Sequence, residues 1–125
     1  MANRSIRSVI LVVEDEWFVR AAMVEELTDR DCLVLEAASG EDALAYLDGQ
    51  VIVDVLFTDI HLGNGINGWD LAEAFREKDP KIGVFYTSGH LLGSRRDVPG
   101  SRFFPKPYSR AAVGEACLEM ANQKI

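Results

Sequence analysis

Five polar side chains that could act together stand at the ends of apolar runs in the sequence. They are Glu14, Asp15, Asp59, Thr87 and Lys106. Carboxylates that share one site repel each other and raise each other's pKa unless a cation joins them. Magnesium suits such a set, because it takes one or two carboxylates, keeps several waters and completes its shell with phosphate oxygens. The three acids therefore predict a Mg²⁺ site.

The lysine and the threonine extend this chemistry to anions. The Lys106 ammonium could neutralise Asp59 or hold an incoming anion, and the Thr87 hydroxyl could donate a hydrogen bond to the same anion. Pro105 and Pro107 stiffen the chain on both sides of the lysine, which suits a residue with a fixed direction. Such groups around one carboxylate favour phosphoryl transfer, in which positioning and charge stabilisation dominate. The carboxylate of Asp59 can itself be the nucleophile, which would give an aspartyl phosphate.

The elements that must position these side chains alternate between two types. Five short apolar runs predict strands, at 9–13, 32–35, 53–58, 82–87 and 102–104. Helical spacing of apolar residues predicts helices between them, for example Val19, Met23 and Leu27 in the first and Val113, Ala116 and Cys117 in the last. This alternation predicts an α/β fold with one doubly wound five-stranded parallel sheet. Ligands of such sheets bind beyond the carboxyl ends of the strands, where the polar side chains stand.

Helix-capping and helix-terminating residues support the same assignment. Ser39 and Asn67 each precede an acid by three residues, Asp42 and Asp70, which is a variant of the capping box at a helix start. The third helix is expected to end at Asp79, before a proline. The segment 90–100 holds two glycines and a proline, so it predicts a short or irregular helix at most.

Composition excludes several protein classes. The 125 residues carry a formal net charge of −7, which disfavours nucleic acid as a direct partner. No apolar run is long enough for a membrane span, and the start of the chain does not resemble a signal peptide. Cys32 and Cys117 form no CxxC motif, so we expect buried reduced thiols in a cytoplasmic protein. No linker divides the chain, so one domain over residues 1–125 is expected.

The sequence resembles the receiver domain of two-component response regulators. Four segments carry the resemblance, in the order that the family has them: 10–16 (ILVVEDE), 55–60 (VLFTDI), 86–89 (YTSG) and 105–108 (PKPY). The resemblance implies a flavodoxin-like (βα)5 fold with strand order 2-1-3-4-5. It also implies a phospho-accepting switch rather than an enzyme that acts on other substrates. The short start before the first strand favours a single-domain, stand-alone receiver, and one excised from a hybrid histidine kinase is the alternative.

The resemblance also assigns roles to single residues. Asp59 would accept a phosphoryl group from a phosphohistidine on a sensor histidine kinase or histidine phosphotransfer protein. Asp15 and Asp59 would ligate Mg²⁺ directly with the backbone carbonyl of His61, and Glu14 would act more remotely through water. Lys106 would contact the phosphoryl oxygens and be followed by a cis peptide bond. Thr87 would turn toward the phosphate, with the aromatic ring of Phe103 following it inward, and output would pass to an unknown downstream protein.

Some features depart from the family pattern or suggest other functions. Glu14 stands where aspartate is commoner, Phe103 lacks the hydroxyl of the usual tyrosine, and Lys106 follows Thr87 by only 19 residues. The His61 side chain either leans over the phosphoryl site or is simply solvated. Trp17 and Trp69, each at the start of a helix, are expected to be partly buried.

Three other functions compete with the phospho-acceptor. A small Mg²⁺-dependent phosphatase with Asp59 as nucleophile would need an acid two residues later, where His61 stands. A pseudo-receiver would need a broken site, and this one is intact in sequence. The GxGxxG pattern at 63–68 lacks the acid about 20 residues further on that a dinucleotide site requires.

Overall fold

The structure, a computed structural model, describes residues 7–123 and contains one five-stranded sheet. The strands are β1 Val9–Val13, β2 Leu33–Ala37, β3 Val55–Asp59, β4 Gly83–Ser88 and β5 Arg102–Pro105. All neighbours pair in parallel in the order β2-β1-β3-β4-β5. The predicted fold class and strand order are therefore confirmed, with strand ends shifted by one or two residues.

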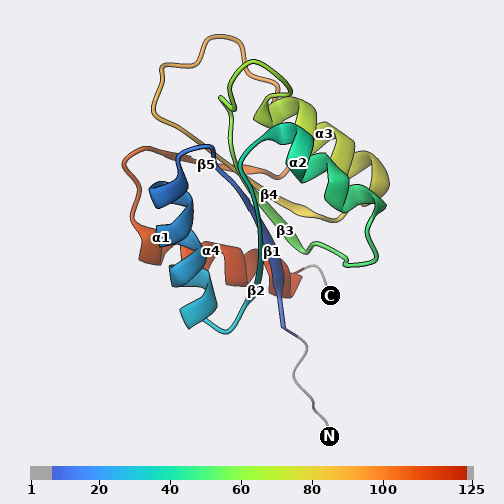
Figure 1. Cartoon of the computed structure of the whole chain (residues 1–125), viewed down its shortest axis with the longest axis vertical. Helices are drawn as coiled ribbons and strands as arrows, with labels where there is room; N and C mark the ends of the chain where they lie inside the picture. The colour runs from blue at the N-terminus through green and yellow to red at the C-terminus, as the bar shows by residue number, and fades with distance from the viewer. Residues whose placement is uncertain (1–6, 124–125) are drawn as a thin grey trace, which may run out of the picture.

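Helices cover both faces of this sheet. They are α1 Trp17–Asp29, α2 Gly40–Leu44, which continues as the 3-10 helix η1 Ala45–Asp48, α3 Gly68–Lys78 and α4 Arg110–Gln123. In Figure 1, α1 and α4 lie on one side of the sheet and α2 and α3 on the other. The third helix ends at Lys78 with Asp79 as its C-cap, so it stops at the predicted Asp79-Pro80 pair. None of the helices described between residues 7 and 123 is both long and apolar enough to cross a bilayer.

The apolar strands explain why both faces need cover. Within β1, Leu11 packs in the cluster under α2 and α3, whereas the adjacent Ile10 packs in the cluster under α1 and α4. The same alternation places Leu56 and Phe57 of β3 on opposite faces. Successive side chains of a strand point to opposite faces, so continuous apolar runs fill both halves of the core. Cys32 and Cys117 are buried in the second cluster as free thiols, as expected.

The two predicted helix starts are capped as the sequence indicates. The Ser39 side chain accepts a hydrogen bond from the Asp42 N–H at 3.1 Å. At α3 the box is reciprocal, because Asn67 Oδ1 accepts from the Asp70 N–H at 2.8 Å and Asp70 Oδ2 accepts from the Asn67 N–H at 3.2 Å. A Cβ on Gly68 would lie 2.5 Å from the carbonyl oxygen of Asp59, so α3 starts closer to the end of β3 than any other residue would allow.

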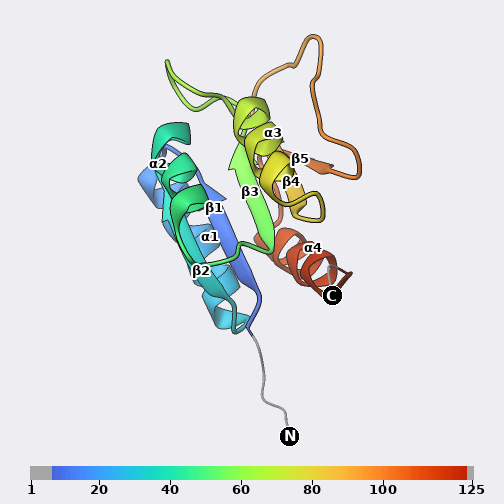
Figure 2. The same ribbon diagram turned by 90° about the vertical axis from the view of Figure 1, so that its right-hand side faces the viewer.

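The segment between β4 and β5, residues 89–101, is called the strap below. It contains no helix and runs as a long yellow-to-orange loop in Figures 1 and 2. The sequence predicted at most a short or irregular helix in this segment, and the structure has none. The N–H of Val98 donates to the buried Tyr86 hydroxyl at 3.1 Å, which ties the strap to the core.

Charged and polar contacts hold the strap against α3. Arg96 lies 2.9 Å from Asp70 and 2.7 Å from Glu73. The Trp69 indole N–H donates to Asp97 at 2.8 Å. Trp69 is half-buried, as expected. These contacts attach the strap to α3 although the strap contains no helix.

The other tryptophan does not follow the expectation. Trp17 is 69% exposed and contacts Phe18 edge to face, with ring centroids 5.9 Å apart. The prediction of partial burial for Trp17 is wrong. Neither core cluster of the described residues includes a residue of the first turn of α1, so no packing of the core covers Trp17.

Candidate functional site

Strand pairing brings the candidate residues to one edge of the sheet. Val13 at the end of β1 pairs with Thr58, so Glu14 and Asp15 emerge beside Asp59. Asp59 in turn pairs with Thr87 of β4. Lys106 follows β5, the next strand in the sheet. The carboxyl ends of four neighbouring strands therefore supply one site.

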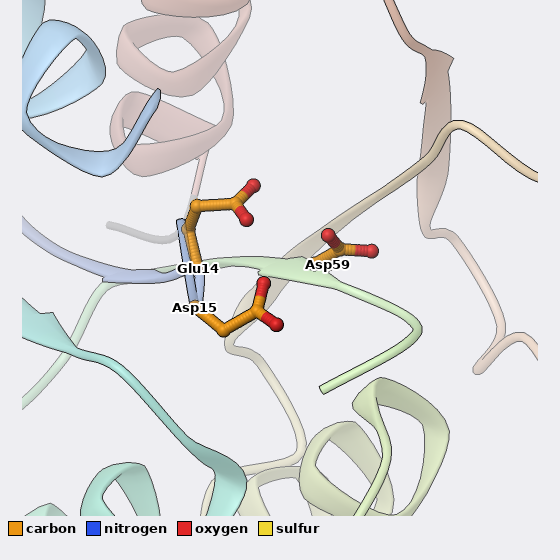
Figure 3. Close-up of side chains that lie close together, drawn as sticks. All are labelled: Glu14, Asp15 and Asp59. Carbon is orange, nitrogen blue, oxygen red and sulfur yellow. The ribbon is translucent and has the colours of Figure 1, made fainter. Parts of the chain in front are cut away.

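The three acids form a compact group. One carboxylate oxygen each from Glu14, Asp15 and Asp59 lie within 4.8 Å of one another, from the ends of β1 and β3 (Figure 3). Glu14 is 3% and Asp59 6% exposed, whereas Asp15 is exposed on the open side. Hard oxygen donors that are fixed on one side and open to water on the other fit Mg²⁺.

Lys106 bridges two of these acids. Its Nζ lies 2.7 Å from Glu14 Oε1 and 2.8 Å from Asp59 Oδ2. The peptide bond between Lys106 and Pro107 is cis, as the resemblance implied. Among the ion pairs of the described residues, Asp15 makes no such contact with the lysine, and its side chain is exposed.

Burial and charge act against each other on this ion pair. Burial raises the pKa of Glu14, although the hydrogen bond from Lys106 acts to lower it. Burial alone would lower the pKa of Lys106, but its hydrogen bonds to Asp59 and Glu14 outweigh burial and raise it. Burial, with the nearby Glu14 charge, also raises the pKa of Tyr108 to about 12. The lysine therefore stays positively charged at neutral pH.

The proposed switch residues lie next to this site. Thr87 is 1% exposed, and its Oγ1 donates to the backbone carbonyl of Phe104 at 2.7 Å. The half-buried Phe103 ring packs against the core below α3, with the Arg95 guanidinium 4.5 Å from its centroid. The hydroxyl that would turn toward a phosphate is thus bonded to β5, the strand that carries the aromatic ring.

Both the backbone and the ring of His61 take part in the site. Its N–H donates to Asp59 Oδ1 at 3.2 Å. Its imidazole is exposed and contacts the ring of His90, with centroids 4.6 Å apart. Both histidines line a hollow of about 490 Å³ that also contains Asp15, Asp59 and Lys106.

Two residues of the site were missed from sequence. His90 follows β4 by two residues, as His61 follows β3, so its place after a strand end was a usable signal. Arg20 donates to the Glu14 carbonyl at 2.7 Å and pairs with Glu36 at 3.0 Å, which fixes the end of β1. A single arginine in a helix gave no comparable signal.

Comparison with known proteins identifies the family of this chain. The family model for the response regulator receiver domain matches residues 10–98. The chain belongs to this family. Receiver domains are parts of two-component systems and accept phosphoryl groups from histidine kinases.

Relatives place this receiver domain more closely. The chain is 31% identical over 124 residues to the sensor kinase CckA of Brucella abortus (strain 2308). This match covers 94% of the chain but only 13% of that protein. A response regulator receiver protein from Sinorhizobium medicae WSM419 matches with a TM-score of 0.88 and 30% identity, over 95% of this chain and 98% of that one. The receiver domain of the hybrid histidine kinase CckA matches with a TM-score of 0.77 and 30% identity, over 91% and 99% of the two chains.

Proposed function

We propose that this receiver domain takes a phosphoryl group onto Asp59 from the phosphohistidine of a sensor histidine kinase or a histidine phosphotransfer protein. The observation that carries the proposal is the Lys106 ammonium, held between Glu14 and Asp59 beside a third carboxylate. In the transfer, an Asp59 carboxylate oxygen bonds to phosphorus as the histidine N–P bond breaks. The released ring nitrogen then takes a proton from solvent.

The residues present fit a Mg²⁺ ion. Asp15, Asp59 and the backbone carbonyl of His61 would hold it, with Glu14 contributing through water. When bound, Mg²⁺ supplies positive charge that offsets the phosphoryl oxygens and the crowded carboxylates. Lys106 would contact the phosphoryl oxygens, because its ammonium already lies 2.8 Å from Oδ2 of the carboxylate that would bond to phosphorus.

The same site would act as a switch. The phosphoryl group carries nearly two negative charges and three acceptor oxygens next to Thr87, in place of the single charge of the carboxylate. Thr87 would exchange its bond to the Phe104 carbonyl for one to the phosphate, and Phe103 would follow. Moving a two-state equilibrium from mostly off to mostly on takes about 5.5 kcal/mol, which a few charge-assisted hydrogen bonds of about 1.5–3 kcal/mol each can supply.

The switched surface would signal through contacts with a downstream protein. A reducing compartment such as the cytoplasm suits the two buried free thiols. This function differs from that of a phosphatase, because the phosphoryl group is held and read rather than turned over.

Labelling with a small phosphodonor tests the proposal. The protein is incubated with acetyl phosphate with and without Mg²⁺, beside the Asp59→Asn variant. We expect Mg²⁺-dependent, retained labelling of the parent and none of the variant. Labelling that survives the substitution, or steady release of phosphate without a retained group, would contradict the proposal.

A further inference from the structure

The chain contains two histidines, and the fold brings their rings into contact. His61 lies two residues after β3 and His90 two residues after β4. Because β3 and β4 pair in parallel, both residues emerge at the same edge of the sheet. Their ring centroids lie 4.6 Å apart at an interplanar angle of 74°. The topology of the sheet, rather than spacing in the chain, therefore builds an imidazole pair.

The ring nitrogens of this pair are not used by the rest of the fold. Both side chains are exposed, and neither belongs to a core cluster. Between residues 7 and 123, no hydrogen bond or ion pair with another protein group uses a ring nitrogen of either histidine. Imidazole nitrogen is the commonest metal ligand among protein side chains. The two rings therefore present uncommitted ligand atoms to the solvent.

The backbone holds both histidines in place. The His61 N–H donates to Asp59 Oδ1 at 3.2 Å. The His90 N–H donates to Ser88 Oγ at 3.1 Å, at the end of β4. Only the exposed side chains need to turn to direct one nitrogen of each ring to a shared point, and such turns are fast. Ligands held on neighbouring strands lose little freedom when they bind, which favours binding.

Negative charge surrounds the pair. Both rings line the hollow of about 490 Å³ that also contains Asp15, Glu16 and Asp59. Asp15 and Glu16 are exposed, and the whole chain has a formal net charge of −7. Lys106, which also lines the hollow, is already paired with Glu14 and Asp59. The surroundings of the two rings therefore attract cations.

We propose that His61 and His90 together bind one divalent transition-metal ion, with Zn²⁺ as the type. Imidazole nitrogen suits Zn²⁺, Ni²⁺ and Cu²⁺, whereas Mg²⁺ takes oxygen ligands. The site therefore differs in its donor atoms from the carboxylate group of Glu14, Asp15 and Asp59. The two imidazoles supply two ligands, and water completes the shell. The inference does not depend on phosphorylation of Asp59.

The separation of the two rings fits such an ion. Zn²⁺ binds histidine nitrogen at about 2.0–2.1 Å, so two rings that share one ion at a right to tetrahedral angle have centres roughly 4.5–5.2 Å apart. The observed separation of 4.6 Å lies in this range. Binding therefore requires rotation of the rings but no movement of the strands that carry them.

A bound ion would also join two segments of the chain. His61 belongs to the loop before α3, and His90 belongs to the strap, residues 89–101. The strap also contains the trypsin sites Arg95 and Arg96. Zn²⁺ should therefore slow tryptic cleavage of the strap several-fold in the parent. It should not do so in His90→Ala, which also controls for any effect of zinc on trypsin itself.

Calorimetric titration with Zn²⁺ in excess Mg²⁺ tests the site, since Mg²⁺ then competes for the oxygen ligands. The parent should bind one Zn²⁺ per chain. His61→Ala, which keeps the backbone carbonyl, and His90→Ala should each weaken binding roughly tenfold or more, because each removes a ligand. His90→Phe keeps an aromatic ring without ring nitrogens and should be as weak as His90→Ala. Leu91→Ala, at the fully exposed next residue, should match the parent.

Several results would overturn the inference. These are a parent-like Zn²⁺ affinity in any of the three histidine variants, or a cleavage rate of the parent strap that Zn²⁺ does not change. A Mg²⁺ titration followed by tryptophan fluorescence separates the two sites, and His90→Ala should leave its midpoint near that of the parent. A shift as large as the loss of Zn²⁺ affinity would place both ions in one site and overturn the inference too. A circular dichroism spectrum of each variant checks that it is folded.

Discussion

Lys106 Nζ lies 2.8 Å from Asp59 Oδ2, although the two residues are 47 positions apart in the chain. The same nitrogen lies 2.7 Å from Glu14 Oε1. One ammonium thus joins the ends of β1, β3 and β5. It balances the negative charge that burial at this edge would otherwise disfavour.

Removing this ammonium should cost stability in a pH-dependent way. Lys106→Met leaves two buried carboxylates without their charged partner, so we expect a loss of about 1–3 kcal/mol in unfolding free energy at neutral pH. Burial already raises the pKa of Glu14, and loss of the lysine raises it further. A raised carboxyl pKa contributes stability that is complete below its unfolded value and is lost as pH rises through the folded value. The deficit should therefore shrink on acidification.

Urea unfolding of the parent and Lys106→Met at neutral and mildly acidic pH measures this effect. Lys81→Met, at an exposed lysine remote from the three acids, is the matched control and should show little change at either pH. An equal loss of unfolding free energy for Lys106→Met at both pH values would contradict the effect of this ammonium on the pKa of Glu14.

Magnesium should bind through the exposed acid of the group. Asp15 offers its carboxylate on the open side, and Trp17 lies two residues further along, 69% exposed. In a Trp69→Phe background, Mg²⁺ should change Trp17 fluorescence, and Asp15→Asn should raise the midpoint of the titration roughly tenfold or more. Glu16→Gln, which alters a neighbouring acid outside the group of three, should leave the midpoint near that of the parent. A midpoint unaffected by Asp15→Asn would contradict the proposed ligand set.

The strap should loosen when its contact with α3 is cut. Burial acts to raise the pKa of Asp97, but hydrogen bonds from Arg95 and Trp69 outweigh it and lower the pKa. Asp97→Ala removes both bonds, so trypsin should cleave after Arg95 and Arg96 several times faster than in the parent. Ser94→Ala, at an exposed position of the strap, is the control. Equal cleavage rates would show that this contact does not hold the strap.

The two thiols should be inert until the protein unfolds. Burial raises the pKa of Cys117 to about 12, from an ordinary value of 9.0. Since a raised pKa favours the protonated form, its stabilising effect is complete below about 9 and is lost as pH rises toward 12. A thiol-specific disulfide reagent should react slowly with native protein at neutral pH and with both cysteines in urea. Rapid reaction of the native protein would contradict this burial.

The fold and the site differ in how far the sequence could predict them. Carboxyl ends of parallel strands meet at one edge, so the approach of Glu14 and Asp15 to Asp59 followed from the strand pattern alone. The residue roles came from the family resemblance. Chain order does not determine which carboxylates a flexible lysine will contact, so the bridge from Lys106 to Glu14 was not predicted.

Side-chain exposure was harder to predict than secondary structure. Trp17 has the size of a core residue, but its burial depends on whether another element covers the start of α1. The glycines and proline of the strap indicated that a helix was unfavourable. They did not indicate that ion pairs from Arg96 to Asp70 and Glu73 attach the strap to α3.

Mapping the phosphoryl group to a single residue tests the central claim most directly. After incubation with acetyl phosphate and Mg²⁺, borohydride reduction converts an aspartyl phosphate to homoserine, which peptide mass spectrometry locates. We expect homoserine at position 59 and at none of the other aspartates. Reduction at Asp15 or elsewhere, with Asp59 intact, would contradict the assignment of Asp59 as the acceptor.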